Sequence, residues 1–501
     1  MRYIGGVSGG AWAATLYTYS QLQVGDIELL GHIVRPENIT LHQLSVMSSN
    51  CMRRYSAKNV FKACLLTKNA KTFADTWVNA IQEVYLRPAN ISKGKFYTWN
   101  QTTLNSITSR NSVLHPEQFI LPASPSRPFL VVSSTILGPI IDAPFNSRFQ
   151  HVNFTRIEFT PLYTGQLKST DITYREWRMY SNDSGTSPST VFSAQRVGGL
   201  LEPFAIMRDQ LYPPSSGLNK NETFGVIEVP VTSVDEGSVV DLGFVVGSSS
   251  YAPGAILSSI GGRSVALKTG MTLNYWSPSS VSPVVTRNLM GDGGSCDNTN
   301  LISFLQRQVD RIVLVLNAHV PLKPRSKWNV SHDEPEEEQI DVDFSSFFGV
   351  VPSRLAFTDS YTSILKRNQV FSKSLWVSVV EELHAAQERG RGIVSSLDLV
   401  TISNPWWGIA GGFKVSVTVV YLGRAAEWES RLSPGIRAVV TPASNPEDMT
   451  SLVDHGPFAR FPHYRTTAGS LNFARANLLA SFMGWVVLQH KDLFMKLLTD
   501  S

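Results

Sequence analysis

The first 20 residues contain the pattern that most restricts how this chain folds. Tyr3-Ile4-Gly5 is typical of a short strand, Gly6 to Gly10 (Gly-Val-Ser-Gly-Gly) of a tight turn, and Ala11 to Tyr19 of a helix. A serine in such a turn matches a nucleophile elbow, where a strained backbone lifts the hydroxyl into a cleft and side chains in place of the glycines would clash. The dipole of the following helix favours negative charge beside the serine. Ser8 is therefore a candidate nucleophile, with Gly6, Gly9 and Gly10 shaping its turn.

A second glycine turn, Asp292-Gly293-Gly294, precedes a helix-like stretch and the apolar run Arg311 to Asn317, which is typical of a buried parallel strand. An aspartate on such a turn can present its carboxylate to a serine hydroxyl without an imidazole between them. Partial burial would raise the pKa of the carboxyl group and make it a stronger base. Each motif alone arises by chance, at ~0.2 per chain for Gly-x-Ser-x-Gly and ~0.1 for Asp-Gly-Gly, and then marks a capped turn. Together they are more restrictive, and they make Asp292 a candidate base for Ser8.

Composition indicates a globular protein, because 43% of the 501 residues are hydrophobic and 17% are charged. The 44 basic and 40 acidic residues leave a net charge of +4, so nothing favours a nucleic-acid partner. The longest apolar run, Ala476 to Leu488, is shorter than the roughly 20 residues that a membrane span needs, and it predicts a buried core helix. No Cys or His cluster has metal-ligand spacing, and we expect neither a metal nor a cofactor.

The cysteines and sequons leave the compartment open. The three cysteines, Cys51, Cys64 and Cys296, cannot form a disulfide framework, although Cys51 and Cys64 can form one disulfide or stay two buried thiols. The Asn-x-Ser/Thr sequons exceed the roughly four or five expected by chance, which is weak evidence for a secreted or lumenal protein rather than a cytoplasmic one. These sequons are at Asn38, Asn90, Asn100, Asn153, Asn182, Asn221 and Asn329.

Strand-like and helix-like segments alternate along the chain, which predicts an α/β protein with a mixed or parallel sheet. We expect one domain over residues 1–501, with a helical insertion at about 30–125 and a solvated acidic loop at about 331–343. Helical spacing in the insertion is clearest at Phe73, Trp77, Ala80, Ile81 and Val84. Further strands are expected at Phe129 to Ser134, Arg156 to Thr160 and Gly225 to Val231, a strand running into a turn at Gly243 to Ser250, and a polar loop at Ser181 to Thr190.

The segment Gly6 to Trp12 (GVSGGAW) resembles the elbow of the cytosolic phospholipase A2 and fungal phospholipase B (lysophospholipase) family, which is related to the patatin-like acyl hydrolases. Further segments resemble the same family, in its order, over most of the chain. They are Glu158-Phe159-Thr160-Pro161, Gly247-Ser248-Ser249-Ser250, Asp292-Gly293-Gly294 with Asp297-Asn298, the strand Val309 to Leu316, Phe461-Pro462-His463-Tyr464 and Asn477-Leu478-Leu479-Ala480.

This resemblance implies a three-layer α/β fold with a central mixed sheet flanked by helices. It also implies a Ser–Asp dyad, in which Ser8 attacks the acyl ester carbonyl of a phospholipid or lysophospholipid and Asp292 takes the proton. Water activated by Asp292 would then hydrolyse the acyl-enzyme, and the Gly9 amide would be one oxyanion donor. The implied partners are the lipid substrate and, transiently, a membrane or micelle surface.

The sequence departs from this family at its start. The family carries a Gly-Gly-Gly-x-Arg/Ser loop one strand and one helix before the elbow, and that loop supplies most of the oxyanion hole. This chain begins at the strand that leads into Ser8, so we expect an N-terminally truncated domain without that strand and loop. Loss of a single oxyanion donor costs ~100-fold or more, so most activity would be lost.

Two alternatives to this hydrolase stay open. One is a Ser-His-Asp esterase in which His455 is the base, because Ser8, Asp292 and His455 follow the chain order of that class. The other is a non-catalytic lipid-binding module or truncated fragment, in which Trp376, Trp406 and Trp407 form an interfacial aromatic patch. Core packing is the commoner role of each tryptophan, and a surface loop is the commoner place of a histidine such as His455.

Overall fold

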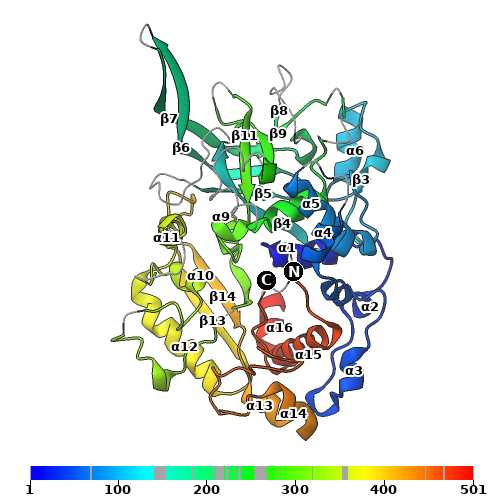
Figure 1. Cartoon of the computed structure of the whole chain (residues 1–501), viewed down its shortest axis with the longest axis vertical. Coiled ribbons are helices and arrows are strands. Elements are labelled where there is room, and N and C mark those ends of the chain that lie inside the picture. Colours follow the sequence, from blue (N-terminus) through cyan, green and yellow to red (C-terminus); the bar gives the residue numbers. More distant parts are fainter. Residues whose placement is uncertain are drawn as a thin grey trace. The chain divides into compact units, whose positions relative to one another are not determined.

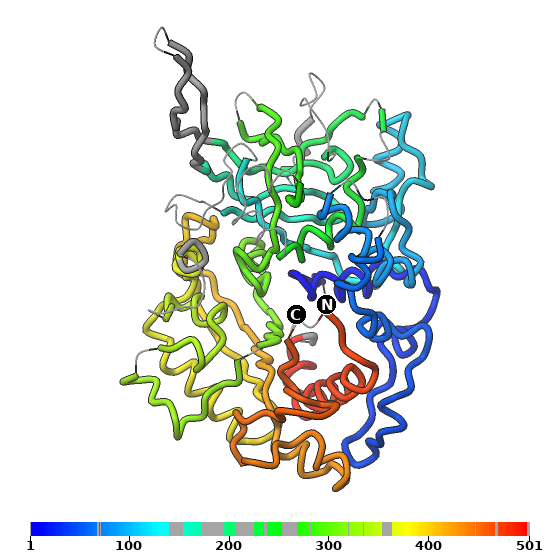
Figure 2. The backbone as a smooth tube through the Cα atoms, in the orientation of Figure 1, coloured from blue at the N-terminus to red at the C-terminus, as the bar shows by residue number. Residues whose placement is uncertain are grey.

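The computed structural model describes residues 2–67, 70, 72–139, 154–182, 185–206, 208, 219–221, 225–231, 233–234, 238–252, 268–280, 283–318, 320–333, 335–352, 359–445, 447–465 and 469–499 (Figure 1). The chain forms two compact units, each assembled from stretches far apart in the sequence (Figure 2). Unit 1 comprises Met1–Gln23, Lys62–Asn300 and Thr358–Ile364, and unit 2 comprises Val24–Phe61, Leu301–Phe357 and Leu365–Ser501. The single domain over residues 1–501 stays a prediction.

Unit 1 is built on a curled mixed sheet in which nine strands are described, in the order β10-β11-β4-β5-β6-β7-β9-β8, with β1 pairing β4 outside this path. The strands are β1 (Tyr3–Gly6), β4 (Phe129–Pro139), β5 (Thr155–Phe159), β6 (Thr164–Asn182), β7 (Gly185–Leu201), β8 (Asn219–Asn221), β9 (Val226–Glu228), β10 (Met271–Tyr275) and β11 (Thr286–Gly291). A separate pair, β2 (Phe96–Tyr97) and β3 (Phe119–Ile120), is parallel. The strands expected near Phe129, Arg156 and Gly225 are confirmed as β4, β5 and β9.

Strand β4 has two different partners along one of its edges. Parallel β1 pairs with its first half and ends at Gly6 opposite Val132, and antiparallel β11 pairs with its second half and ends at Gly291 opposite Thr135. Strand β5 takes the other edge, since both Val132 and Thr135 also have partners in β5. The carboxyl ends of β1 and β11 therefore point at each other across the two β4 residues between these positions.

The helices of unit 1 flank this sheet, which confirms the predicted α/β class with a mixed sheet. Helices α1 and α7 both contact β4, and α5 packs against α7. The helices are α1 (Gly9–Tyr19), α5 (Phe73–Ile81), the π-helical turn η3 (Gln82–Leu86), α6 (Gln101–Arg110) and α7 (Leu242–Ser249), and single 3-10 turns lie at Arg87–Ala89, Pro116–Gln118, Pro203–Ala205 and Gly293–Ser295. The strand, turn and helix expected over residues 3–20 and the helix from Phe73 are confirmed.

The expectation of a strand at Gly243 to Ser250 is wrong, because this segment is α7. Its residues are buried on every side, and a short apolar run of this kind does not distinguish a buried helix from a buried strand. The helix begins where the Asp241 carboxylate accepts the Phe244 amide hydrogen bond at 2.7 Å. Asp241 also accepts a hydrogen bond from the Gly94 amide at 2.7 Å, so the same side chain ties the helix start to a neighbouring loop.

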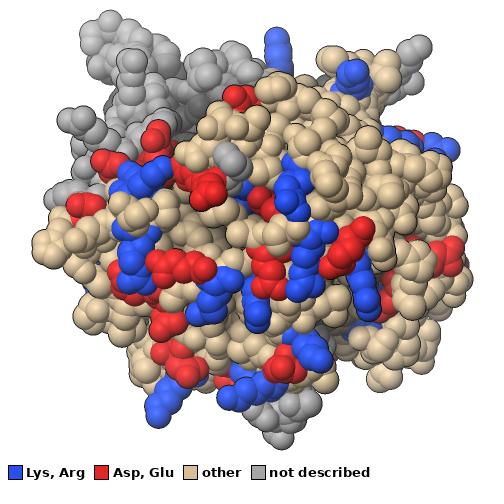
Figure 3. All heavy atoms as spheres, turned by 90° about the horizontal axis from the view of Figure 1, so that it is seen from below, with Lys and Arg blue, Asp and Glu red and all other residues tan. Residues whose placement is uncertain are grey.

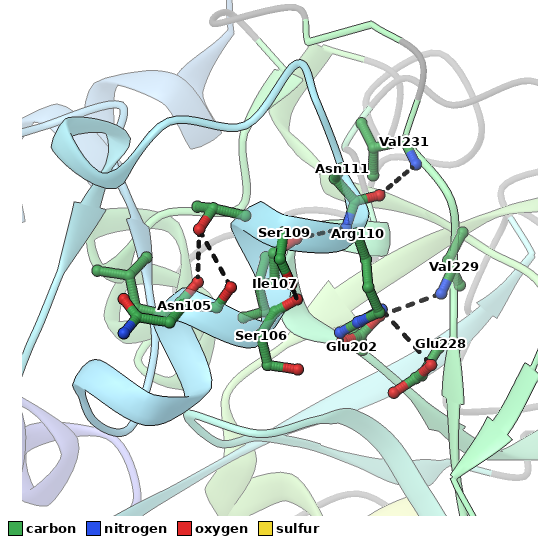
Figure 4. A network of polar contacts seen from close by, with 12 residues as sticks. Asn105, Ser106, Ile107, Ser109, Arg110, Asn111, Glu202, Glu228, Val229 and Val231 are labelled. Atoms are coloured by element: carbon green, nitrogen blue, oxygen red, sulfur yellow. Dashed lines mark hydrogen bonds and ion pairs between the residues drawn. The ribbon is translucent and has the colours of Figure 1, made fainter.

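Ion pairs and amide contacts fasten the end of α6 to the strands beside it (Figure 4). Arg110, in the last turn of α6, lies 2.6 Å from Glu202 and 3.6 Å from Glu228. The other Glu202 oxygen accepts the Val229 amide at 3.1 Å. Burial raises the pKa of Glu202 even though Arg110 opposes that shift. Arg110 therefore balances the charge of the buried Glu202 carboxylate. The helix dipole favours the positive charge of Arg110 at the C-terminal end of α6.

Unit 2 contains a three-stranded sheet, β12-β14-β13, formed by β12 (Arg311–Leu316), β13 (Ile393–Val400) and β14 (Lys414–Tyr421). Strand β12 is parallel to β14, as predicted, but it is an edge strand whose Val313 and Val315 are 45% and 62% exposed. The expectation that this strand is fully buried is therefore wrong. The apolar run contains alternating inward and outward positions that its composition does not reveal.

Helices α13 (Ala426–Ser430) and α15 (Phe473–Gln489) contribute to a hydrophobic cluster of unit 2 that includes Trp428, Phe461 and Phe482. The apolar run near the C-terminus forms α15, whose inner face belongs to this cluster, as predicted. The others are α2 (Asp26–Leu30), α3 (Leu41–Ser45), α9 (Leu301–Gln306), α10 (Val342–Ser346), α12 (Trp376–Glu388), α14 (Pro434–Val440) and α16 (Lys491–Thr499), with 3-10 turns at Pro36–Asn38, Met52–Ala57, Arg325–Lys327 and Lys373–Leu375. Helices α4 (Val60–Leu66) and α11 (Asp359–Arg367) have residues in both units. In the described part of the chain, no helix combines the length and the apolar character that crossing a bilayer requires.

Two expected loops differ from the structure. The described residues of the polar stretch Ser181 to Thr190 continue β6 and β7, with Ser181 opposite Thr186 and Asn182 opposite Gly185, because ladder hydrogen bonds form between backbones whatever the side chains are. The acidic stretch 331–343 is a surface segment only as far as Glu338. Beyond it Asp341 is buried and accepts the amide hydrogen bonds of α10, so its charge serves as a helix cap.

The segment 30–125 is largely helical, as expected, but it is divided between the two units and contains β2 and β3. Cys51 and Cys64 are buried thiols that form no disulfide, so the second of the two alternatives left open for them is confirmed. Asn38, Asn90, Asn100 and Asn329 are exposed. Of the other sequons, Asn153 and the side chains of Asn182 and Asn221 lie outside the described residues.

Acidic and basic side chains are interspersed on the face drawn in Figure 3, without a large area of one sign. Oppositely charged neighbours on the surface of unit 2 form ion pairs, such as Arg391 with Glu427 at 2.7 Å. Such pairs contribute about 0–1 kcal/mol each, so they are a property of the surface more than a source of stability.

Candidate active site

The opposed ends of β1 and β11 bring the two predicted catalytic residues together. Ser8 follows β1 and Asp292 follows β11, and the Ser8 hydroxyl donates a hydrogen bond to Asp292 Oδ2 at 2.9 Å across 284 residues of sequence. No imidazole stands between the two groups. The arrangement can therefore transfer a proton directly from hydroxyl to carboxylate.

The backbone around Ser8 has the form of an elbow. Ser8 has a φ of 51°, in the left-handed region that side chains rarely adopt, and it is the N-cap residue of α1. A Cβ on Gly6 would lie 2.6 Å from the carbonyl carbon of Gly10, so glycine is required there. A Cβ on Gly9 or Gly10 would meet nothing within 4 Å, so the expectation that glycine avoids a clash holds for Gly6 alone. The described residues therefore leave open space beside Gly9 and Gly10.

The Asp292 turn is pressed against β4. A Cβ on Gly293 would lie 2.2 Å from the Ser133 carbonyl oxygen, and the Thr135 hydroxyl donates to the Asp292 carbonyl at 2.9 Å. The Gly294 amide donates to Asp292 Oδ1 at 2.9 Å. One carboxylate oxygen is thus held by the turn itself, and the other faces Ser8.

Replacing Gly293 by Ala is expected to destabilise the protein and to displace Asp292, because the added methyl group meets a strand carbonyl that cannot move without breaking the sheet. We expect a loss of about 1–3 kcal/mol in the free energy of unfolding, measured by chemical denaturation. The control is Gly435→Ala in α14, where the new methyl group meets nothing within 4 Å. Equal stability of the two variants would contradict the steric argument.

Burial raises the pKa of Asp292 to about 6, and the hydrogen bonds from the Gly294 amide and the Ser8 hydroxyl partly offset that rise. Desolvation acts in this direction because a carboxylate loses more than a neutral carboxyl group when water is removed. The pKa lies close enough to neutrality for the group to accept a proton in one step and return it in the next.

A buried charge cluster lies behind the aspartate turn. Arg156 on β5 is 3.0 Å from Glu158 and 3.8 Å from Asp297, and all three side chains are at most 2% exposed. Asp297 belongs to the same loop as Asp292 and also accepts hydrogen bonds from the amide and hydroxyl of Thr299. The cluster therefore anchors the loop that carries the aspartate to the central sheet.

Several segments that resemble the phospholipase family meet in unit 1. Glu158 and Asp297 share Arg156, and Asn298 lies beside Gly294, where a Cβ on the glycine would be 2.7 Å from the Asn298 oxygen. Ser249 accepts the Ser8 amide hydrogen bond at 3.0 Å. The four segments containing Ser8, Glu158, Ser249 and Asp292 are thus neighbours around one break in the sheet.

The remaining candidates lie in unit 2. His463 is fully buried and its Nδ1 is 2.6 Å from the Ala318 carbonyl oxygen, and Phe461 packs on Trp428 and Tyr464. His455 is exposed.

The interfacial aromatic patch is wrong, because two of its three tryptophans are buried. Trp376 is 6% exposed and Trp407 1%, and the Trp407 indole donates to Asn368 at 3.0 Å. Trp406 is partly exposed, with the Arg367 guanidinium 4.2 Å from the centre of its ring.

Sequence reasoning missed the residues of β4 and β5 that hold the site. Ser133, Ser134 and Thr135 interrupt an otherwise apolar strand, and Arg156 precedes Glu158 by two positions, which is the spacing of one strand face. Polar residues inside a strand that is otherwise apolar were the available signal.

Comparisons of the chain with protein-family models, with curated proteins and with solved structures found no match. Among the residues that the structure describes, no group of three or more His, Cys, Asp and Glu side chains is placed to hold a metal ion.

Proposed function

We propose that this protein is a serine acyl hydrolase in which Ser8 and Asp292 form a catalytic dyad. The observation that carries the proposal is the 2.9 Å hydrogen bond from the Ser8 hydroxyl to Asp292 Oδ2, made at an elbow with a left-handed serine. A hydroxyl becomes an effective nucleophile when a base within hydrogen-bond reach takes its proton. The raised pKa of Asp292 makes it a stronger base than an exposed aspartate.

In the first half-reaction, Ser8 Oγ attacks the ester carbonyl carbon and its proton moves to Asp292. The tetrahedral intermediate collapses, the alcohol leaves with the proton from Asp292, and the acyl group stays on Ser8. In the second half-reaction, water attacks the acyl-enzyme and gives its proton to Asp292. Ser8 then leaves with that proton, and the fatty acid is released.

The start of α1 supports negative charge on the reacting oxygen. Gly9 is the first residue of α1, and open space lies beside its Cα. The amides of Gly10 and Ala11 bind the carbonyls of Val7 and Ser8 at 2.8 and 3.0 Å, so they close the turn. We assign the Gly9 amide, together with the helix dipole, as the oxyanion donor of this dyad.

We propose fatty-acyl esters of phospholipids or lysophospholipids as the substrate, hydrolysed at a membrane or micelle surface, and a patatin-like fold for unit 1. This finer assignment depends on the family resemblance, and its support is that four of the resembling segments surround one pair of reactive groups. The Ser-His-Asp alternative has less support. His455 is an exposed residue of unit 2, and Asp292 already bonds the hydroxyl that His455 would have to activate.

The experiment is to treat the protein with a fluorophosphonate and to locate the adduct by mass spectrometry, in parallel with fatty-acid release from lysophosphatidylcholine. We expect the adduct on Ser8, and we expect Ser8→Ala to lose both labelling and fatty-acid release. The control is Ser126→Ala, which removes another accessible hydroxyl far from Asp292 in sequence and is expected to change neither. An adduct on a different serine, or fatty-acid release by Ser8→Ala, would remove the proposal.

A further inference from the structure

The backbone at Ser8 is held by a side chain instead of by the sheet. The Ser249 hydroxyl accepts a hydrogen bond from the Ser8 amide at 3.0 Å and donates one to the Ser133 carbonyl at 2.7 Å. Ser249 is in the last turn of α7 and is fully buried. A single hydroxyl thus bridges the nucleophile elbow and the central strand.

This hydroxyl fills the break in the sheet between β1 and β11. The β1 ladder ends at Val132 and the β11 ladder starts at Thr135, so at Ser133 neither strand is a partner on that edge. A serine hydroxyl has one donor and can also accept, so it satisfies a carbonyl and an amide at once. Without it, the Ser8 amide and the Ser133 carbonyl would each lose this hydrogen bond, which is costly for enclosed groups.

We propose that Ser249 is a positioning residue of the dyad: by holding the Ser8 amide it keeps the elbow in its left-handed conformation and the Ser8 hydroxyl on Asp292. This role rests on the proposed function. A left-handed serine is strained and persists only where its surroundings over-determine it. The Ser249 bond supplies that constraint at the amide of the strained residue itself, and the Asp292 bond supplies it at the hydroxyl.

Helix α7 is suited to this role because it is fixed at both ends. Asp241 caps its start, and three successive serines at its end reach three different elements. Ser248 bonds the Ser134 hydroxyl of β4 at 2.8 Å, Ser249 bonds the elbow, and the Trp12 indole of α1 donates to Ser250 at 3.0 Å. Ser248 is therefore a matched control: it is the same residue type in the same helix turn and equally buried, and its hydroxyl bonds Ser134 of β4 and the Val245 carbonyl of its own helix.

The experiment compares Ser249→Ala, Ser249→Cys and Ser249→Thr with Ser248→Ala and with the Ser8→Ala baseline, using kcat, KM, the pH profile and thermal unfolding. We expect Ser249→Ala and Ser249→Cys to lower kcat by ~10- to 100-fold with KM unchanged, since geometry at the nucleophile is altered and substrate binding is not. The acid limb of the pH profile near 6 should stay, because Asp292 keeps its surroundings. Ser249→Thr keeps the hydroxyl and should recover most of kcat.

Ser248→Ala is expected to keep kcat within ~3-fold whatever its thermal stability, which separates positioning from general loosening of α7. A wild-type kcat in Ser249→Cys would overturn the positioning role, and that variant decides the matter if Ser249→Ala does not fold. An equal loss of kcat in Ser248→Ala and Ser249→Ala would also overturn it. If Ser8→Ala itself stays active, the proposed function fails together with this role. If Ser8→Ala is inactive and the Ser249 variants are unimpaired, only the positioning role fails.

Discussion

Asp292→Asn is expected to lower kcat by at least ~10³-fold and, in the same protein, to raise the free energy of unfolding at pH 7. Asparagine keeps the shape of the side chain and an oxygen for the Gly294 amide, but it has no basic carboxylate to take the Ser8 proton. Activity is lost because the base is lost. Stability is gained because a buried charge is removed.

The gain in stability depends on pH in a defined way. Burial raises the pKa of Asp292 from 3.8 to about 6, so the folded protein binds this proton more tightly than the unfolded chain does. The protonated carboxyl group contributes to the free energy of unfolding below pH 4, and this contribution is lost as the pH rises from about 4 to about 6. A difference of about 2 in pKa corresponds to an upper limit of about 3 kcal/mol. Asp292→Asn should therefore be more stable than wild type above pH 6 and equal to it near pH 4.

Activity of the wild-type protein should follow the opposite course, because the base must be ionised. We expect kcat/KM to fall as the pH drops through about 6. The measurements are urea denaturation at several pH values and a pH–rate profile. The control is Asp448→Asn in unit 2. There the Lys327 ammonium, 2.5 Å away, and the Thr450 hydroxyl hold the pKa of Asp448 below its usual value, so removal of the charge should destabilise the protein and leave activity unchanged. A destabilised Asp292→Asn would contradict the linkage.

Arg156→Ala is expected to have the largest effect on stability, a loss of about 3–5 kcal/mol. The guanidinium and its partners Glu158 and Asp297 are almost fully buried, and its removal leaves two carboxylates without their cation inside the protein. The desolvation of both charges is then no longer offset by the guanidinium. The measurement is guanidinium chloride denaturation. Activity should fall as well, because Asp297 anchors the loop that presents Asp292.

A matched control lies on the same sheet. Arg196 on β7 is 3.9 Å from Asp171 on β6, and the two side chains are 47% and 61% exposed. Arg196→Ala should change the free energy of unfolding by at most about 0.5 kcal/mol, since an exposed pair gains little in water. If Arg156→Ala and Arg196→Ala lowered the free energy of unfolding by similar amounts, burial would not explain the effect of Arg156.

The local parts of the site were predictable because each is encoded within a few residues. A serine between glycines after a strand predicted the elbow, and an aspartate before two glycines predicted a carboxylate on a turn. Their direct hydrogen bond was also a prediction, since no imidazole was needed between them. The pairing of β1 and β11 with one edge of β4 was not predictable, because register between strands more than 100 residues apart depends on the whole sheet.

The errors share a physical origin. Gly243 to Ser250 reads as a strand because a short apolar run has no visible period when every side is buried. Ser181 to Thr190 is expected to be a loop because its sequence is polar, whereas the backbones of its described residues are paired in β6 and β7. Asp341 reads as solvated because nothing nearby in the sequence signals that its carboxylate caps a buried helix. In each case tertiary surroundings outweigh local composition.

The shared edge of β4 sets the distance between the two residues of the dyad. Strands β1 and β11 are both registered against it and not against each other, so the separation of hydroxyl and carboxylate is a difference between two independent alignments. A slip of either strand by one residue would move its end by roughly 3.3 Å and turn its side chains to the opposite face. Ser8 and Asp292 are separated by 284 positions, and we expect insertions in the loops of that segment to leave both alignments unchanged. We therefore expect the Ser8–Asp292 geometry to tolerate a longer or shorter connection between the two residues. We do not expect it to tolerate a shift of β1 or β11 along β4.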